Sequence, residues 1–332
     1  MSDSPRRAYI SGIGMCVPER VMTNEEFEAR TDIDTSDEWI TQMTGIKERR
    51  YVADEDATSD LAIPAVRLAL ERAGVEGADV DAIIVGTATP DTYFPSTACL
   101  IQNAIGARKA FAYDIAAACS GFIFGLVQAE SYIRTGFAKN VVVVGAETLT
   151  RITNFSDRNT CVLFGDGAGA AVVQGSDSDR GLVDTFLKCD GRLSDYIIER
   201  AGGSRMPASH ETVDQNLHTI DMQGRRVFVN ANKAMSDSVV LLLERQGLTG
   251  DDLDILFPHQ ANIRIIQSVA EKAGLPMEKV YVNIHKYGNT SAASIPIAMA
   301  EAYEEGRLKE GMLVGMVAFG SGFTWGSALV RW

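Results

Sequence analysis

The chain has 332 residues, 46% apolar and 23% charged, proportions typical of a globular protein with room for two hydrophobic cores. Its formal net charge of −13 argues against a surface that binds nucleic acid or an anionic membrane. The five cysteines are scattered and form no CxxC pair, so we expect neither a disulfide framework nor a metal site. The polar N-terminus and the lack of about 18 consecutive apolar residues predict a cytoplasmic protein.

The first half of the chain alternates apolar strands with amphipathic helices. We predict strands at 8–15, 82–86, 112–115 and 141–145, and helices at 24–30, 36–43, 59–73, 96–105 and 122–135. Thr35 or Ser36 caps the second of these helices. The near-continuous apolar run at 141–145 is typical of a strand in a sheet covered on both faces.

A glycine-rich run at 165–170 follows, and it leads into another strand at 171–173. A dinucleotide-binding fingerprint requires a strand before the glycines and a helix after them. We therefore interpret these glycines as sites of close packing against a neighbouring backbone. The segment at 176–224 is more polar and less periodic, which predicts a covering excursion with surface strands.

Part of the pattern returns near the C-terminus at a constant offset of 173 residues. Residues 70–74 (LERAG) match residues 243–247 (LERQG), and Cys119 falls on Ala292, where another helix begins. Several matches at one offset predict a duplicated α/β fold. We expect an N-terminal half at 1–175, the covering excursion at 176–224 and a C-terminal half at 225–332.

Cys119 lies where a buried strand turns into a helix. Unpaired N–H groups and the positive end of the helix dipole favour a thiolate at such a place. Cysteine pKa values there fall to roughly 3.5–7.5. The small residues around Cys119 leave room for an acyl group. From this stretch alone, a nucleophile and an inert buried cysteine are both open.

Two polar residues of the second half occupy comparable positions. His259 follows a strand at 255–257, and Asn289 precedes the helix at 292–303. Sites in α/β units form at the carboxyl ends of strands and at helix N-termini. If the halves pack about a pseudo-twofold axis, Cys119, His259 and Asn289 converge in one pocket. The other three histidines lack such a placement, and we interpret them as structural or exposed.

Seven motifs spread over nearly the whole chain carry a family resemblance. They are residues 34–40 (DTSDEWI), 44–46 (TGI), 117–122 (AACSGF), 164–170 (FGDGAGA), 258–262 (PHQAN), 288–294 (GNTSAAS) and 318–326 (AFGSGFTWG). Together they resemble β-ketoacyl-[acyl-carrier-protein] synthase III, the initiating condensing enzyme of bacterial fatty acid biosynthesis. The resemblance implies a thiolase-like fold with duplicated α/β halves in five αβαβα layers. It also implies a homodimer that uses a coenzyme A thioester as substrate and needs no cofactor.

The chemistry that the resemblance implies is a decarboxylative Claisen condensation by a ping-pong route. Cys119 takes an acyl group, usually acetyl, from acyl-CoA. Malonyl-acyl-carrier-protein then loses CO2, and its carbanion attacks the acyl-cysteine to give a 3-oxoacyl-carrier protein. His259 and Asn289 would donate hydrogen bonds to the enolate oxygen, and the backbone N–H groups of Cys119 and Ser321 would hold the tetrahedral oxyanion.

The resemblance implies further roles outside this centre. Trp39, Arg158 and Thr35 match positions that bind coenzyme A. Phe94 matches a residue that crosses the dimer interface to close the acyl pocket, and Arg264 matches an arginine that docks the carrier protein. The chain also departs from well-known members, because Met43, Val229 and Glu271 stand where those carry basic residues. These departures leave fewer basic contacts for an acidic carrier protein.

Other functions fit part of the pattern. A papain-like hydrolase uses cysteine, histidine and asparagine in this order, but it lacks a duplicated parallel α/β pattern. A degradative thiolase needs a second cysteine in the loop at 320–322, and the elongating synthases have a histidine where Asn289 stands. A paralogue that uses another starter or acceptor in secondary metabolism stays open. A non-catalytic binding protein would not need the three polar residues.

Overall fold

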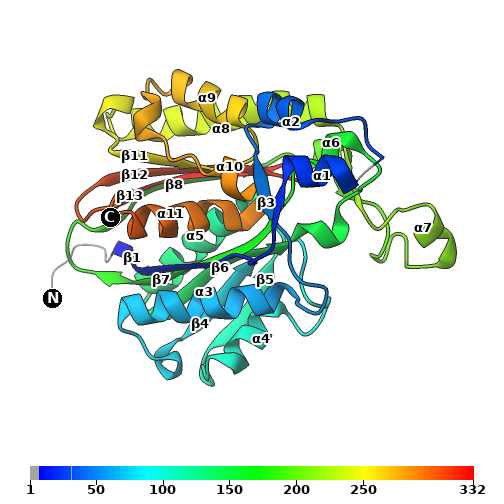
Figure 1. Ribbon diagram of the computed structural model, residues 1–332. Coiled ribbons are helices and arrows are strands. Elements are labelled where there is room, and N and C mark those ends of the chain that lie inside the picture. The colour runs from blue at the N-terminus through cyan, green and yellow to red at the C-terminus, as the bar shows by residue number, and fades with distance from the viewer. Residues whose placement is uncertain (1–6, 31) are drawn as a thin grey trace.

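The computed structural model describes residues 7–30 and 32–332, which fold into five layers (Figure 1). Two helical pairs form the outer layers, and a third pair lies between two sheets. From one side to the other, the pairs are α3 (Thr58–Ala73) with α4 (Thr97–Ala104), α5 (Gly121–Arg134) with α11 (Ser294–Glu304), and α8 (Gly224–Arg245) with α9 (Ile263–Lys272). This arrangement confirms the predicted αβαβα architecture.

The first sheet has the strand order β1-β7-β6-β4-β5. Its strands are β1 (Arg7–Cys16), β4 (Ala82–Gly86), β5 (Phe111–Ile115), β6 (Asn140–Thr148) and β7 (Asp166–Ser176). β4 is parallel to β5 and β6, whereas β7 is antiparallel to β6 and β1. Helices cover both faces, so every residue of β4 is buried and the strand is apolar along its whole length.

The second sheet has the order β11-β12-β13-β8. Its strands are β8 (Gly181–Cys189), β11 (Ile255–Pro258), β12 (Leu313–Gly320) and β13 (Thr324–Arg331). The sequence placed residues 181–189 in the covering excursion, but β8 pairs with β13 as the edge strand of this sheet. Most of β8 is only half-buried, so it lacks the apolar run by which a core strand is recognised.

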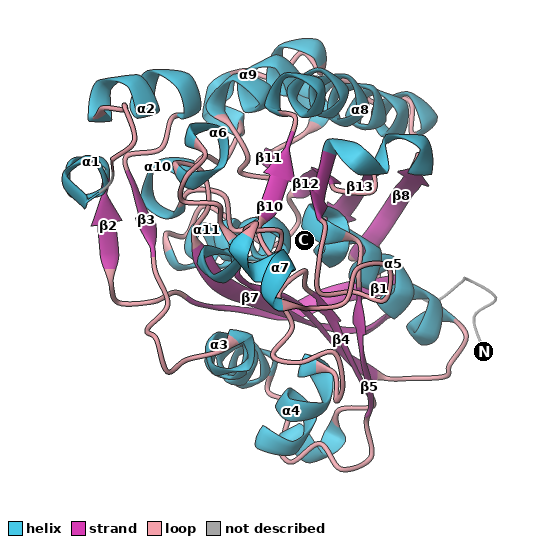
Figure 2. Cartoon of the chain, turned by 90° about the vertical axis from the view of Figure 1, so that its right-hand side faces the viewer, coloured by secondary structure: helices cyan, strands magenta, loops and turns pink. Residues whose placement is uncertain are grey.

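The rest of the excursion covers the side of the molecule where both sheets end. It contains the two-stranded ribbon of β9 (Ile197–Glu199) and β10 (Ile220–Met222), and the short helix α7 (His210–Asp214). The segment with α7 projects from the body at the right of Figure 1 and faces the viewer in Figure 2. The exact limits 1–175, 176–224 and 225–332 stay a prediction.

Six smaller elements complete the set of α-helices and β-strands in the described chain. They are β2 (Val21–Thr23), β3 (Glu48–Arg50), α1 (Asn24–Arg30), α2 (Asp37–Thr44), α6 (Arg158–Cys161) and α10 (Ile284–Tyr287). Ser36 caps α2 as predicted, because its Oγ accepts the Trp39 N–H at 3.2 Å. No helix within residues 7–30 and 32–332 combines the length and the apolar composition that crossing a bilayer requires.

The duplication is visible at the centre of the molecule. α5 and α11 begin 173 residues apart, and each follows a 3₁₀ turn, Ala118–Ser120 in one half and Ser291–Ala293 in the other. Ala118 and Ser291 share an uncommon left-handed backbone, with φ of 44° and 47°. The constant offset therefore relates two copies of one strand–turn–helix unit.

The glycine-rich run belongs to β7 rather than to a loop before it. A Cβ on Gly169 would lie 2.7 Å from Cβ of Pro296 on α11. Since real Cβ atoms essentially never come this close, the glycine lets strand and helix pack in direct contact. The interpretation as close packing is confirmed, and the helix needed for a dinucleotide fingerprint is absent after the run.

Candidate active site

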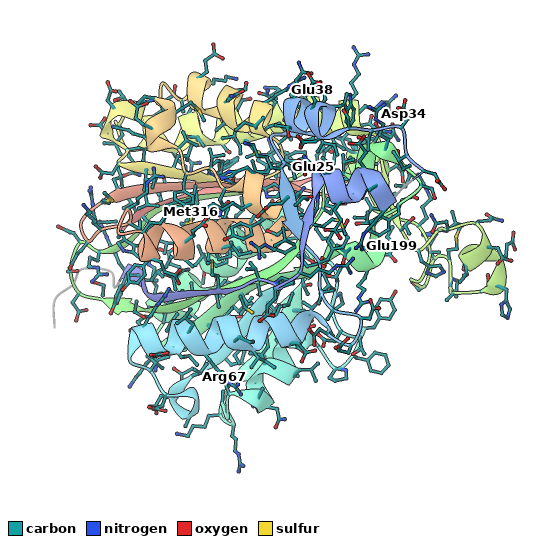
Figure 3. All side chains as sticks on the ribbon, viewed as in Figure 1. Glu25, Asp34, Glu38, Arg67, Glu199 and Met316 are labelled. Carbon is teal, nitrogen blue, oxygen red and sulfur yellow. The ribbon has the colours of Figure 1, made fainter. Side chains whose placement is uncertain are left out.

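Cys119 lies in the 3₁₀ turn before α5, at the junction of two pockets. The larger pocket, of about 380 Å³, is lined by Ala88, Leu149, Ile198, Ile220 and other mostly apolar residues. The smaller one, of about 120 Å³, contains His259, Asn289 and Ser321. Glu199, labelled in Figure 3 on the side of the body from which the α7 segment projects, also lines the larger pocket. Cys119 can therefore hold an apolar group in one pocket while a second reactant enters the other.

The thiol of Cys119 is held in its protonated form in this structure. Burial raises its pKa to about 12, and the carboxyl of Glu147 raises it further. A hydrogen bond from Ser291 and the Cys119 backbone N–H oppose this shift. The expectation of a lowered pKa at the helix start was wrong for this site, because loss of hydration outweighs the turn's N–H groups. Cys119 nevertheless keeps partial exposure through its pockets.

His259 follows β11 and is 2% exposed. Its backbone N–H donates to the Val317 carbonyl at 2.7 Å, which fixes the residue against β12. Its Nδ1 lies 2.7 Å from Oγ of Ser294, the first residue of α11. Burial lowers the pKa of His259 to about 3, so the ring is neutral. The Ser294 hydroxyl can donate to Nδ1, and in that tautomer the ring carries its proton on Nε2 and can donate it into the pocket.

Asn289 enters the same pocket from the loop between α10 and α11 and is 7% exposed. Its backbone is tied to the neighbouring chain by two bonds, one to the Leu163 carbonyl and one from the Gly165 N–H. Its side-chain Oδ1 accepts the Ser291 N–H at 2.9 Å. Because Oδ1 is occupied, the amide Nδ2 is the group free to donate into the pocket.

The turn between β12 and β13 lies directly against Cys119. A Cβ on Gly320 would lie 2.6 Å from the Cys119 backbone nitrogen, so only glycine permits this approach. The next residue, Ser321, lines both pockets. Its hydroxyl donates to the Ile197 carbonyl at 2.6 Å, which leaves the backbone as its contribution to the site. Cys119 and Ser321 are thus neighbours where the two pockets meet.

Trp39 and Arg158 meet at the surface, on α2 and α6. The Arg158 guanidinium lies 3.7 Å from the centre of the Trp39 ring, a stacking contact. Arg158 Nε and Thr35 Oγ1 are buried atoms without a hydrogen bond in the described chain. The structure brings together Trp39 and Arg158, two of the residues predicted to bind coenzyme A, outside the two pockets at Cys119.

Phe94 and Arg264 lie away from the reacting thiol. Phe94 is 87% exposed and does not line the larger pocket of its own chain. Arg264, in the first turn of α9, donates to the Gln42 carbonyl at 3.2 Å and contacts Sδ of Met43 at 3.4 Å. It lies beside Asn262 and Ile265, which line the smaller pocket. Arg264 thus belongs to the surface around that pocket.

Sequence reasoning missed Ser291, Ser294 and Glu147. Both serines lie in the quoted motif 288–294, but only their contacts reveal what they do. Glu147 is a single acidic residue near the end of an apolar strand, and nothing in the surrounding sequence indicates that it lies near Cys119. The repeat could have identified one of them. The offset of 173 residues pairs Ser291 with Ala118, the residue before Cys119, and so places Ser291 near the reacting cysteine. Within the described residues, no group of acidic, histidine and cysteine side chains is arranged to hold a metal ion.

Comparison with known proteins gives one consistent result. Two family models match, 3-oxoacyl-[acyl-carrier-protein] synthase III over residues 113–191 and its C-terminal region over residues 243–332. A β-ketoacyl-[acyl-carrier-protein] synthase III from Caldanaerobacter subterraneus is 53% identical and one from Clostridioides difficile is 51% identical. Each of these alignments covers 98% of both chains.

A solved structure extends this similarity to the fold. The 3-oxoacyl-[acyl-carrier-protein] synthase III of Aquifex aeolicus superposes with a TM-score of 0.90 at 45% identity, over 98% of this chain and 100% of that one. Sequence and fold therefore agree over nearly the full length, and the chain belongs to the β-ketoacyl-[acyl-carrier-protein] synthase III family of thiolase-fold condensing enzymes.

Proposed function

We propose that the chain condenses acetyl-CoA with malonyl-acyl-carrier-protein to give 3-oxoacyl-carrier protein, CoA and CO2, the first condensation of fatty acid biosynthesis. One observation carries the proposal. Cys119 opens into an apolar pocket on one side and into the pocket of His259 and Asn289 on the other. An acyl group and a malonyl thioester can therefore be held on opposite sides of one sulfur.

The first half-reaction is thioester exchange on Cys119. The sulfur adds to the acetyl carbonyl carbon, and the carbon–sulfur bond to coenzyme A breaks as its thiolate leaves. The backbone N–H groups of Cys119 and Ser321 stabilise the tetrahedral oxyanion, and each such donor contributes on the order of 3 kcal/mol. The apolar pocket then holds the methyl group of the acetyl-enzyme.

The second half-reaction is decarboxylation followed by carbon–carbon bond formation. As CO2 leaves, negative charge develops on the malonyl thioester oxygen. Nε2–H of His259 and Nδ2–H of Asn289 are the two donors oriented for that oxygen. A neutral histidine suits this role, because it stabilises the enolate without giving it a proton. The carbanion then attacks the acetyl carbonyl, and the Cys119 thiolate leaves.

Three further assignments follow the family resemblance. Trp39, Arg158 and Thr35 bind the nucleotide end of coenzyme A, and the stacked guanidinium moves aside to admit the adenine. Arg264 docks the carrier protein beside the smaller pocket. Phe94, exposed on its own chain, closes the acyl pocket of a partner in a homodimer. No cofactor is required, and the cytoplasmic location stays a prediction.

The alternative in secondary metabolism is less well supported. Identity of 53% over 98% of both chains favours the fatty acid enzyme over a paralogue with another starter or acceptor. A panel of acyl-CoA starters with malonyl-acyl-carrier-protein, analysed by product mass, tests the choice. We expect acetyl-CoA to give the highest turnover. No product from any acyl-CoA with the carrier-protein substrate would overturn the proposal.

The two half-reactions separate the residues of the site. His259→Ala and Asn289→Ala should keep acetylation of Cys119 while losing two to three powers of ten in condensation, about the effect of one missing oxyanion donor. Rapid-quench mass measurement gives the acetylation rate, and CO2 release gives the second step. If His259→Ala failed to acetylate but decarboxylated normally, the roles would be reversed.

A further inference from the structure

A buried carboxylate behind Cys119 takes no part in the steps above. Glu147, near the end of β6, is 0% exposed and belongs to none of the ion pairs of the described chain. Its Oε2 accepts the Ala88 N–H at 2.9 Å, the Thr89 N–H at 3.2 Å and the Thr89 hydroxyl at 2.8 Å. Its Oε1 has no hydrogen bond of standard geometry among the described residues. Burying a carboxylate oxygen without a hydrogen-bond partner costs free energy, so its presence here calls for an explanation.

The packing of β6 directs this carboxylate toward the reacting cysteine. Gly145 and Glu147 lie on the same face of β6, because side chains alternate along a strand. A Cβ on Gly145 would lie 2.1 Å from the Ala292 carbonyl oxygen, so this face touches the turn Ser291–Ala293. Burial raises the pKa of both the Glu147 carboxyl and the Cys119 thiol, and the Ser291 hydroxyl opposes the shift of each. Ser291 belongs to this turn and lines the larger pocket together with Cys119, so it lies between β6 and the reacting cysteine.

The thiol proton has to leave Cys119 before the sulfur can attack. In the tautomer that the proposed mechanism requires, His259 is an unsuitable acceptor, because Ser294 engages Nδ1 and Nε2 carries the hydrogen that is donated to the enolate. The groups that hydrogen-bond to Oε2 of Glu147 belong to Thr87, Ala88 and Thr89, and all of them are uncharged. The charge of the Glu147 carboxyl also raises the pKa of the Cys119 thiol, as expected for two groups that lie close together.

We propose that Glu147 accepts the proton of Cys119 through the hydroxyl of Ser291. The Sγ–H proton passes to Ser291 Oγ while the Ser291 hydroxyl proton passes to Glu147 Oε1, so the serine is unchanged. Glu147 becomes neutral, the sulfur adds to the thioester, and the departing CoA thiolate takes a proton from solvent. When condensation later expels the Cys119 thiolate, the proton returns from Glu147 by the same route. Glu147 is a positioning residue that acts only through Ser291, and its role rests on the proposed function.

The test isolates the first half-reaction with two variants. Glu147→Gln keeps the shape of the side chain but cannot accept a proton. Ser291→Ala removes the relay hydroxyl, and Ala118 shows that alanine adopts this backbone in the equivalent turn. Each variant should acetylate Cys119 at least about 100-fold more slowly near neutral pH, within the usual range for a lost general base. The double variant should lose no more than either single variant, because both changes break one relay.

Two readouts distinguish this role from a structural one. The acetylation rate of Glu147→Gln should rise about tenfold per pH unit, since solvent hydroxide must then remove the proton. Its decarboxylation of malonyl-acyl-carrier-protein should stay close to that of the unmodified protein. Glu147→Asp, which keeps a carboxylate, should recover part of the acetylation rate.

Three results would overturn the inference. If Glu147→Gln acetylated Cys119 as fast as the unmodified protein or faster, the Glu147 carboxylate would only disfavour the thiolate by charge repulsion. Equal loss of both half-reactions would mean a structural role for Glu147. If Glu147→Gln failed to fold, an unchanged acetylation rate in Ser291→Ala would still exclude the relay. Failure of the unmodified protein to acetylate would instead refute the proposed function.

Discussion

Ser294 fixes the orientation of the His259 ring through a hydrogen bond to Nδ1. The contact of 2.7 Å between Ser294 Oγ and His259 Nδ1 is the histidine's one side-chain hydrogen bond in the described chain. Without it, the ring can rotate or exchange tautomers, and Nε2 no longer donates reliably toward the enolate. Ser294 is therefore a positioning residue for the second half-reaction and has no role in the first.

Ser294→Ala should slow condensation about tenfold, equivalent to about 1.4 kcal/mol, while acetylation of Cys119 is unchanged. Ser327→Ala is a matched control, because Ser327 is also a buried serine and its hydroxyl bonds the Ser238 carbonyl outside the site. Separate rates for acetylation and for CO2 release provide the measurement. An equal effect on both rates would mean that Ser294 supports only the local fold.

The convergence of Cys119, His259 and Asn289 in one pocket was predictable from residue types and from the offset, but their charge states were not. His259 and Asn289 were placed by their positions at the ends of repeated elements, which the pattern of the sequence contains. The pKa of Cys119 depends on how many atoms surround the sulfur, and those atoms come from β6, β12 and the turn before α11. Contacts between segments so distant in sequence leave no periodic signal in any one of them.

At the scale of elements, the contact between β6 and the turn Ser291–Ala293 holds the two halves together at the site. Gly145→Ala would force a Cβ against the Ala292 carbonyl, where only backbone can yield. We expect a loss of at least about 3 kcal/mol in the free energy of unfolding, measured by urea denaturation. Gly203→Ala should be nearly neutral, because a Cβ there would meet open space. Similar stabilities for the two variants would contradict this account of the contact.

Arg264 joins α9 to the end of α2 and carries the charge expected to dock the carrier protein. Arg264→Glu should raise the KM for malonyl-acyl-carrier-protein at least about tenfold at low salt and leave acetylation by acetyl-CoA unchanged. Arg264→Lys keeps the charge but loses the geometry of the contact with Gln42. If Arg264→Lys raises the KM as much as Arg264→Glu does, the contact between α9 and α2 matters rather than the charge.

Elements buried on both faces were the easiest to predict. The strand predicted at 82–86 coincides with β4, whose residues are all buried. β8 was missed because an edge strand with half-buried, mixed residues resembles a surface loop in sequence. The sequence therefore predicts the buried inner strands of the sheets better than it predicts an edge strand.

At the scale of the whole molecule, buried carboxylates make stability depend on pH. Asp166, at the start of β7, is 0% exposed, and burial raises its pKa to about 6 against the pull of bonds from Thr150 and Val52. A carboxyl whose pKa is higher in the folded state stabilises the fold when protonated. That contribution is complete below the unfolded pKa of about 3.9 and is lost as pH rises through about 6.

Asp166→Asn removes this dependence, although it also disturbs the hydrogen bonds. The stability advantage of the unmodified protein over the variant should shrink by about 1 kcal/mol between about pH 5 and about pH 7.5. Urea titrations of both proteins at the two pH values provide the comparison. A constant or growing advantage would mean that Asp166 is already ionised at the lower pH.

The duplication explains why one chain can hold two reactants. Its central turns bring Cys119 from one half and Ser291 from the other to the junction of the pockets. The other four cysteines lie elsewhere: Cys161 is buried in another core cluster, Cys16 is half-buried against a third, and Cys99 and Cys189 are exposed away from both pockets. The proposed acyl transfer therefore depends on one sulfur.

The most direct measurement is the location of the acyl group during turnover. The protein is incubated with acetyl-CoA, quenched in acid and digested, and the peptides are mapped by mass spectrometry; malonyl-acyl-carrier-protein is added to a parallel sample before quenching. We predict one acetyl group on the peptide that contains Cys119, and its loss when the second substrate arrives as acetoacetyl-carrier protein forms. An acetyl group on another cysteine while Cys119 stays free, or one on Cys119 that malonyl-acyl-carrier-protein does not remove, would contradict the account.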